Sequence, residues 1–322
     1  MRIYKDFSLK EILYYKIGGR ARFVLKIENK VDLLEALDFV QKNKPQKVLP
    51  VGLGSNLLVS DDFFDGVILW FSQVETKDIE QTSDGLVKVF AGVILDDLIQ
   101  FSFKHNLVGL EWAGGLPSTI GGAVRGNAGA FGGEIGRSVD KIEVFEVGND
   151  GEFVQKTLAA SDLEFGYRDS LIKRNKNMII GNAVLRLNKV DYAMLQQAKN
   201  IYLSHIEYRN KNHPLEYPSC GSVFKNIVKK EEVQKMLRVW GDIKDLVEKK
   251  WYHKVSTGYV INRLGFSGLR VGGAEVSRKH ANYIVNIGGA KFDDVISIIE
   301  RIRDKFSATF GFYPELEVEV VK

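Results

Sequence analysis

The chain has 322 residues, of which 45% are hydrophobic and 27% charged, so it can bury a large core, and its length favours two domains. Its formal net charge of +4 comes from 45 basic and 41 acidic residues spread along the chain, which argues against a nucleic-acid binder with its concentrated positive charge. A single cysteine excludes a disulfide framework within the chain, and the five histidines lack the spacing of a zinc site, so no metal is expected.

Hydrophobic periodicity predicts a mixture of strands and helices up to residue 208. In chain order these are a strand at 21–27, a helix at 31–40, strands at 48–51, 67–71 and 86–90, a helix at 95–105, strands at 141–147, 153–156 and 178–187, and a helix at 191–208. The polar run that follows ends at Pro214, and this composition predicts a domain boundary near the end of the last helix.

The remainder of the chain is also mixed. It is predicted to form helices at 231–239, 243–250 and 292–310 and a final strand at 316–321. The pattern favours an α+β fold in two lobes over the strict alternation of a doubly wound sheet. No segment resembles a secretory signal or is apolar enough to cross a bilayer, so we expect a cytoplasmic protein without membrane contacts.

Glycine is the most unusual residue in the composition. There are 31 glycines, whereas average usage of about 7% would give a number in the low twenties. Ten lie between Gly109 and Gly136 and six between Gly265 and Gly289. Glycine allows a ligand to approach the main chain closely, so the run from Gly114 to Gly133 predicts a backbone that wraps a large planar or pyrophosphate-bearing ligand. Glycines that merely pack loops together are the less favoured alternative.

Another glycine turn follows the predicted strand at 48–51, in the sequence Gly-Leu-Gly-Ser-Asn at 52–56. It could also bring backbone N–H groups to a phosphate. The motif is not GxGxxG and no helical pattern follows it, which excludes a Rossmann or Walker site. A simple tight hairpin turn is an equally good interpretation.

The segment 218–226 presents Ser222 beside Lys225 and Asn226, as the edge of a binding site would. A serine here could equally be a turn former or a helix cap. Cys220 lies two residues before Ser222 and has no histidine near it in the sequence, so we interpret it as a packing residue and not as a nucleophile.

Two more positions carry charge in suggestive places. Arg168 stands among aromatic residues, where a surface ion pair with Asp169 is the simpler interpretation. Acidic residues alternate at Glu315, Glu317 and Glu319 on the predicted last strand, where a solvated face is the default. If that face lines a cleft, the glutamates would have shifted pKa values and could perform acid–base or electrostatic work.

Taken in order, these segments resemble the UDP-N-acetylenolpyruvoylglucosamine reductases, FAD enzymes of peptidoglycan precursor synthesis. The resemblance runs from about Tyr15 to Val318 and fits the branch without an extra substrate-capping insertion. Its motifs are GLGSN, GGLPSTIGGAVRGNAGAFGGE, FGYRDS, GSVFKN and the late pair GLRVGGA and KHANYIVN. The chain departs from the family pattern at Ser118, Cys220 and Ile227, where glycine, alanine and proline respectively are usual.

The resemblance implies a vanillyl-alcohol-oxidase or PCMH-type FAD-binding domain at 1–208, with its core at about 15–190. It also implies a smaller α+β substrate domain at 209–322, whose last strand returns Glu317 to the active site. The implied catalytic residues are Arg168, Ser222 and Glu317, and those near the UDP portion of the substrate are Tyr167, Lys225 and Asn226. The implied cofactor-binding residues are Gly52, Gly54, Ser55, Asn56, Leu57, Gly114, Gly115, Pro117, Ser118, Thr119, Gly121, Gly122, Asn127 and Gly129.

The implied activity is an NADPH-dependent reduction of UDP-N-acetylglucosamine enolpyruvate to UDP-N-acetylmuramate. Hydride passes from flavin N5 to the vinyl carbon, and Ser222 protonates the α carbon. Arg168 stabilises the negative charge that spreads into the carboxylate, Glu317 helps to hold the enolate, and Lys225 near Ser222 favours the proton transfer. The expected partners are a UDP-sugar and NADPH, and a monomer is expected.

Two other functions are compatible with the same fold. One is a different oxidoreductase with noncovalent FAD; the attachment is expected to be noncovalent because no histidine or cysteine lies between His105 and His205. The other is a flavin-binding module without catalysis. The presence of Arg168, Ser222 and Glu317 argues against this last function, since a module without turnover would have no need of the three together.

Overall fold

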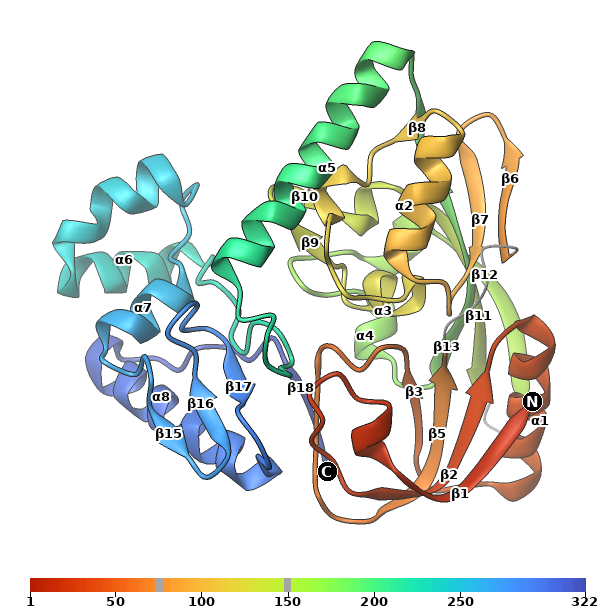
Figure 1. The fold of residues 1–322 in the computed structure, drawn as a ribbon, viewed down its shortest axis with the longest axis horizontal. Helices are drawn as coiled ribbons and strands as arrows, with labels where there is room; N and C mark the ends of the chain where they lie inside the picture. The colour runs from red at the N-terminus through yellow and green to blue at the C-terminus, as the bar shows by residue number, and fades with distance from the viewer. Residues whose placement is uncertain (73–77, 148–151) are drawn as a thin grey trace. The chain divides into compact units, whose positions relative to one another are not determined.

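The computed structural model describes residues 1–72, 78–147 and 152–322 (Figure 1). The chain divides into two compact units. Unit 1 comprises Met1–Phe7, Ala21–Leu53 and Phe64–Lys211, and unit 2 comprises Ser8–Arg20, Gly54–Phe63 and Asn212–Lys322.

This division differs from a single boundary after residue 208, because two early segments belong to the C-terminal unit. One of them carries β4 (Leu57–Val59), which pairs in parallel with β18 (Glu319–Val321) at the end of the chain. The other carries the fully buried Tyr15, whose hydroxyl donates to the carbonyl oxygen of Ile284 at 2.8 Å. Pairing over more than 250 residues leaves no trace in local periodicity, so the sequence could not predict it.

Unit 1 contains a four-stranded sheet in the order β1–β2–β5–β3. Its strands are β1 (Arg2–Ser8), β2 (Arg20–Ile27), β3 (Val48–Val51) and β5 (Phe64–Phe71). Both β2 and β3 run parallel to β5, and α1 (Lys30–Asn43) makes the crossover from β2 to β3. The side chain of Asn29 caps α1 by accepting from the Asp32 N–H. The predicted strands at 21–27, 48–51 and 67–71 and the predicted helix at 31–40 are confirmed.

A second, five-stranded antiparallel sheet of unit 1 has the order β12–β11–β13–β7–β6. Two helices contribute to the same hydrophobic core as these strands: α2 (Leu95–Lys104) and α5 (Tyr192–Asn212), which is the long green helix in Figure 1. The predicted helix at 191–208 is confirmed and continues to Asn212. The strands are β6 (Ile79–Ser83), β7 (Leu86–Phe90), β11 (Val139–Val147), β12 (Phe153–Ala159) and β13 (Met178–Arg186).

The glycine-rich segment of unit 1 folds into short pieces between α2 and β11. They are β8 (Leu107–Val108), a 3-10 turn at Glu111–Ala113, α3 (Ile120–Arg125), β9 (Gly129–Ala130), β10 (Gly133–Glu134) and a 3-10 turn at Ile135–Arg137. After β12 come a 3-10 turn at Ala160–Leu163 and α4 (Leu171–Arg174), and β14 (Asn188–Lys189) pairs with β8. Most of the backbone between α2 and β11 therefore lies in loops and short turns.

Unit 2 packs a small antiparallel sheet, β15–β16–β17, with α8 (Phe292–Phe310) in one hydrophobic cluster. The sheet strands are β15 (Arg270–Val271), β16 (Ala274–Val276) and β17 (Ile284–Asn286), and the other helices are α6 (Lys230–Val239) and α7 (Thr257–Arg263). The predicted helix at 292–310 is confirmed to the residue. The region 243–250 is not one α-helix: a 3-10 turn ends at Ile243 and a π-helical turn spans Leu246–Lys250.

No helix in the described parts of the chain is both long enough and apolar enough to span a membrane. Among the same residues, no group of three or more His, Cys, Asp or Glu side chains is placed to hold a metal ion.

Candidate active site

The start of α3 offers neutral, accessible backbone. Thr119 caps the helix, with its hydroxyl accepting from the Gly122 N–H at 3.3 Å. Gly115 and Gly122 are exposed, and the run from Gly114 to Val124 has no charged side chain. A Cβ placed at Gly122 would have only the hydroxyl oxygens of Ser118 and Thr119 within 4 Å. Small residues, hydroxyl groups and open backbone fit a pyrophosphate-bearing cofactor such as FAD.

Other glycines of the same run are required by protein packing. A Cβ at Gly133 would overlap the indole ring of Trp112, and a Cβ at Gly114 would lie 2.5 Å from the carbonyl oxygen of Tyr202 in α5. At Gly129 it would lie 2.7 Å from the carbonyl oxygen of Gly133. Protein packing therefore requires glycine at these three positions, whereas a Cβ at Gly122 would meet hydroxyl oxygens at 3.3 and 3.4 Å and no backbone atom outside its own helix.

The buried Arg209 near the end of α5 also holds the run, because its Nε donates to the Gly114 carbonyl oxygen at 2.9 Å. The sequence did not indicate this role, because Arg209 stands in a polar run that resembles a linker. Only continuation of the predicted helix at 191–208 could have indicated that it belongs to unit 1.

The GLGSN turn is divided between the two units. Gly52 and Leu53 belong to unit 1, and a Cβ at Gly52 would overlap the hydroxyl of Thr119, so this glycine packs directly on the cap of α3. Gly54 to Leu57 belong to unit 2, where Gly54 has φ +64°. The Asn56 amide nitrogen donates to the Glu317 carbonyl oxygen at 3.1 Å.

Replacement of Gly52 by alanine is expected to destabilise unit 1 by about 1–3 kcal/mol, the usual cost of overpacking, and to weaken FAD retention. The added methyl group would push Thr119 away from its capping position. Gly126→Ala is the matched control, because φ is −84° there and the added Cβ would approach nothing closer than 3.4 Å. Thermal unfolding and flavin content after gel filtration measure both effects. Equal behaviour of the two variants would contradict the expectation.

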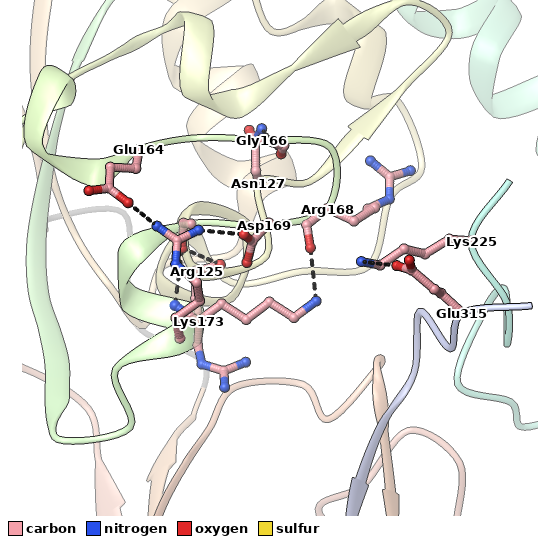
Figure 2. A network of polar contacts seen from close by, with 11 residues as sticks. Arg125, Asn127, Glu164, Gly166, Arg168, Asp169, Lys173, Lys225 and Glu315 are labelled. Carbon is pink, nitrogen blue, oxygen red and sulfur yellow. Dashed lines mark hydrogen bonds and ion pairs between the residues drawn. The ribbon is translucent and has the colours of Figure 1, made fainter. Parts of the chain in front are cut away.

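Arg168 lies at the tip of a tight turn in unit 1 (Figure 2). Gly166 and Asp169 exchange two backbone hydrogen bonds, of 3.0 and 3.1 Å, and leave Tyr167 and Arg168 between them. The half-buried Arg168 has φ +57°, donates from its guanidinium to the Gly129 carbonyl oxygen, and has its Cζ 5.4 Å from the centre of the Tyr167 ring. The Asp169 carboxylate is bound by Arg174.

Asn127 supports this turn through a hydrogen bond to its backbone. It is buried, with 1% of its surface exposed, and its amide nitrogen donates to the Gly166 carbonyl oxygen at 2.8 Å. Its amide oxygen accepts from the Gly136 N–H at 3.0 Å. The side chain of Asn127 is thus engaged by protein groups.

In unit 2, the segment carrying Ser222 lies beside the segment carrying Glu317. The N–H of Glu317 donates to the Val223 carbonyl oxygen at 2.8 Å, and Phe224 bridges to Leu316. Both Ser222 and Glu317 are half-buried. The predicted strand at 316–321 is shorter than expected because its first residues bond to this segment, and only Glu319–Val321 join β4.

The buried Asn282 fixes the same segment. Its side chain accepts from the Phe224 N–H at 3.0 Å and donates to the Phe224 carbonyl oxygen at 2.8 Å, and its own carbonyl oxygen accepts from the Val223 N–H at 2.8 Å. The sequence analysis gave Asn282 no role. Its place in the KHANYIVN motif was the only signal.

Lys225 is paired with the carboxylate of Glu315, which is solvent-exposed as predicted. Its Nζ lies 3.3 Å from Glu315 Oε2, and Lys229 Nζ lies 2.6 Å from Glu315 Oε1 (Figure 2 shows the first pair). The hydrogen bond from Lys229 is the largest influence that lowers the pKa of Glu315. Asn226 accepts from the Thr257 N–H at 3.1 Å, which ties this end of the segment to α7.

Cys220 is confirmed as a packing residue, because only 1% of its surface is exposed. Burial raises the pKa of its thiol from 9.0 to about 12, and the negative charge of Glu317 adds to this effect. A thiol with such a pKa is neutral at physiological pH and is a poor nucleophile.

The burial of Cys220 predicts a pH dependence of stability. Below pH 9 the thiol is neutral in the folded and unfolded chain, so its contribution to stability is fully present. Between pH 9 and about 12 only the unfolded chain ionises, so the free energy of unfolding falls as the pH rises. Urea unfolding at pH 8 and pH 10.5 should show a smaller fall for Cys220→Ala than for the parent chain. Parallel losses in the two proteins would exclude this role of the thiol.

Comparison with protein families gives two matches. Residues 213–321 match the model described as UDP-N-acetylenolpyruvoylglucosamine reductase, C-terminal domain. Residues 21–155 match an FAD binding domain. Both matches agree with the predicted order of an FAD-binding part followed by a second domain.

Whole-chain comparisons point the same way. A UDP-N-acetylenolpyruvoylglucosamine reductase of Thermotoga maritima is 36% identical over 95% of this chain and 94% of its own length. One from Streptococcus agalactiae is 32% identical over 98% and 93%. The crystal structure of UDP-N-acetylenolpyruvylglucosamine reductase from Thermus caldophilus covers 100% of both chains with a TM-score of 0.74 and 27% identity. The predicted α+β fold with its PCMH-type FAD-binding domain is confirmed.

Proposed function

Because the chain belongs to the UDP-N-acetylenolpyruvoylglucosamine reductase family, and is thus an FAD-dependent oxidoreductase of peptidoglycan synthesis, we propose that it reduces UDP-N-acetylglucosamine enolpyruvate to UDP-N-acetylmuramate with NADPH. The observation that carries this proposal is the hydrogen-bonded pairing of the Ser222 segment with the Glu317 segment in unit 2. It places a hydroxyl and a carboxylate on adjacent backbone, the two group types that protonation and stabilisation of an enolate require.

FAD, when bound, supplies the hydride carrier between NADPH and the vinyl carbon of the substrate. The chain would hold it noncovalently through the exposed backbone before α3 and through the GLGSN turn, where Gly52 packs on Thr119. The proposed contacts come from Gly52, Gly54, Ser55, Asn56, Leu57, Gly114, Gly115, Pro117, Ser118, Thr119, Gly121, Gly122 and Gly129.

Arg168 would stabilise the negative charge that develops on the substrate carboxylate. A guanidinium presents two parallel N–H groups that match the two oxygens of a carboxylate. In the structure one of its nitrogens donates to the Gly129 carbonyl oxygen, so the side chain is already ordered from within unit 1. An ordered donor loses less entropy on binding the charge than a free one.

Ser222 would donate the proton to the α carbon, and Glu317 would help to hold the enolate. A serine hydroxyl is a weak acid, but a carbanion is a strong base, so the transfer is feasible. Asn282 fixes the backbone of Val223 and Phe224, next to Ser222. This support limits the movement of the proton donor.

Tyr167, Lys225 and Asn226 would bind the substrate near its UDP portion. Lys225 is paired with Glu315, which is shared with Lys229. Lys229 also pairs with Glu232, so the cation proposed to meet the diphosphate is Lys225 itself. We further propose that the protein acts as a monomer in the cytoplasm, a compartment that suits its single free thiol.

Anaerobic titration tests the proposal directly. The purified protein should carry the absorbance of noncovalent flavin, lose it on addition of NADPH, and regain it when UDP-N-acetylglucosamine enolpyruvate is added. A protein that binds no FAD would overturn the whole proposal. Flavin that is reduced by NADPH but not reoxidised by the substrate would indicate a different reductase with the same fold.

A further inference from the structure

We propose that Asn127 is a positioning residue that sets the place of Arg168, through the backbone of the turn at 166–169. The inference rests on the role proposed above for Arg168 in the second half-reaction. Asn127 donates to the carbonyl oxygen of Gly166 at the start of this turn and accepts from the N–H of Gly136 in a separate segment, and Figure 2 shows it next to Gly166.

The turn needs support from outside. Arg168 has φ +57°, a left-handed conformation that an arginine adopts at a cost. The two hydrogen bonds between Gly166 and Asp169 close the turn but fix nothing beyond it. Such a conformation persists only where the surrounding structure holds it.

Lys173 supplies part of that support, because its Nζ donates to the Arg168 carbonyl oxygen at 2.9 Å (Figure 2). Asn127 supplies the support at Gly166, and its amide is fully used in doing so. The nitrogen donates to the Gly166 carbonyl oxygen at 2.8 Å and lies 3.4 Å from Glu134 Oε2, while the oxygen accepts from the Gly136 N–H at 3.0 Å. Only 1% of the residue is exposed. A buried amide with its donors and acceptor engaged acts on the protein backbone and not on a ligand.

The same short loop also holds the other end of Arg168. Gly129, two residues after Asn127, accepts the hydrogen bond from the Arg168 guanidinium. The segment 127–129 therefore holds both the turn that carries the backbone of Arg168 and the guanidinium of its side chain. Since 127–129 lies in the glycine run proposed to hold FAD, one loop would set the arginine and the cofactor at a fixed spacing.

The expected effect of losing the Asn127 amide is selective. FAD binding and reduction by NADPH do not involve Arg168 and should be retained. Reoxidation by the substrate should slow by about 10- to 100-fold, the range expected when a catalytic group is displaced by up to 1 Å.

Asn127→Gly is the appropriate variant, because glycine accepts the φ of +41° found at this position and removes only the amide. Asn127→Asp separates the two bonds: it retains an oxygen for the Gly136 N–H but places an acceptor against the Gly166 carbonyl. We expect it to be at least as slow as Asn127→Gly. Asn175→Gly, an amide that bonds Glu146 and not the turn, is the control and should react as the parent does.

A double-mutant cycle with Arg168→Met decides whether Asn127 acts through the arginine. If it does, Asn127→Gly slows reoxidation in the parent but not in the Arg168→Met background. Equal slowing in both backgrounds, or no slowing in the parent, overturns the proposal. Loss of FAD together with a lowered melting temperature in Asn127→Gly, but not in Arg168→Met, also overturns it, because Asn127 would then only maintain the fold.

Amide hydrogen exchange gives a readout that does not depend on the reaction. The Asp169 N–H bonds to the carbonyl oxygen that Asn127 holds, so it should exchange faster in Asn127→Gly than in Asn175→Gly. Unchanged protection in Asn127→Gly overturns the inference even if reoxidation is slowed. If the parent protein is not reoxidised by the substrate, the proposed function fails, and faster exchange at Asp169 still supports the positioning of the turn.

Discussion

Ser222→Ala is expected to lose product formation by about 10²- to 10⁴-fold while its flavin is still reduced by NADPH at the parent rate. The range is the usual contribution of a positioned general acid, and only the second half-reaction needs a proton at the α carbon. Stopped-flow measurement distinguishes reduction of the flavin by NADPH from its reoxidation by the substrate. The backbone of the segment should not change, because it is held by main-chain bonds to Asn282 and Glu317 and not by the hydroxyl.

Ser204→Ala is the matched control for this prediction. Ser204 is an exposed serine on α5 whose hydroxyl donates only to the Ile201 carbonyl oxygen of its own helix. Its removal should leave both half-reactions unchanged. Normal reoxidation in Ser222→Ala would remove Ser222 from the role of proton donor, and the source of the proton would then have to be sought elsewhere.

Arg168→Met is expected to slow reoxidation by the substrate by about 10²- to 10³-fold, as removal of one charge-stabilising donor does in other enzymes. Methionine retains length and apolar contact but lacks the charge and the paired N–H groups. Arginine and methionine would adopt the left-handed conformation of residue 168 at the same cost, so the substitution should not change the backbone of the turn. Arg168→Lys should fall between the two, because it restores the charge without the fork.

Arg174→Met provides the control for the loss of an arginine near the turn. Arg174 lies at the end of α4 and pairs with Asp169 and Glu164 at the surface. An exposed ion pair contributes little to stability, so this variant should retain both half-reactions. If Arg168→Met and Arg174→Met slow the reaction equally, the effect comes from the charge of the region and not from Arg168 itself.

The fold could be predicted wherever a segment carries its own periodicity. The helix at 292–310 places Val295, Ile298, Ile299 and Ile302 on one face, and its bounds are confirmed. The π-helical turn at Leu246–Lys250 has the same composition as an α-helix, so nothing in the sequence separates the two. The strands β15, β16 and β17 have two or three residues each, too few to show any period.

The site divides in the same way. Ser222, Arg168 and Glu317 have reactive or charged side chains, so they can be singled out as candidates in the sequence. The order of their motifs along the chain gave the resemblance to the reductase family. Asn127 and Asn282 act on backbone atoms through an amide, and an amide in a loop has many ordinary uses, so their roles could not be separated from turn formation in advance. Glu315 is exposed, as the alternation of acids predicts, but its pairing with Lys225 and Lys229 joins segments distant in the sequence and could not be predicted.

The pairing of β4 with β18 has a consequence for the order in which the chain can fold during synthesis. The chain passes between the units five times, and the strand at Leu57–Val59 leaves the ribosome more than 250 residues before its partner at Glu319–Val321. Unit 1 has all its described sheet strands once residue 189 has emerged, whereas unit 2 lacks β18 until residue 321 has emerged. Until β18 emerges, β4 lacks its partner strand, so unit 2 is completed later than unit 1, and chaperone binding or aggregation would compete with that completion.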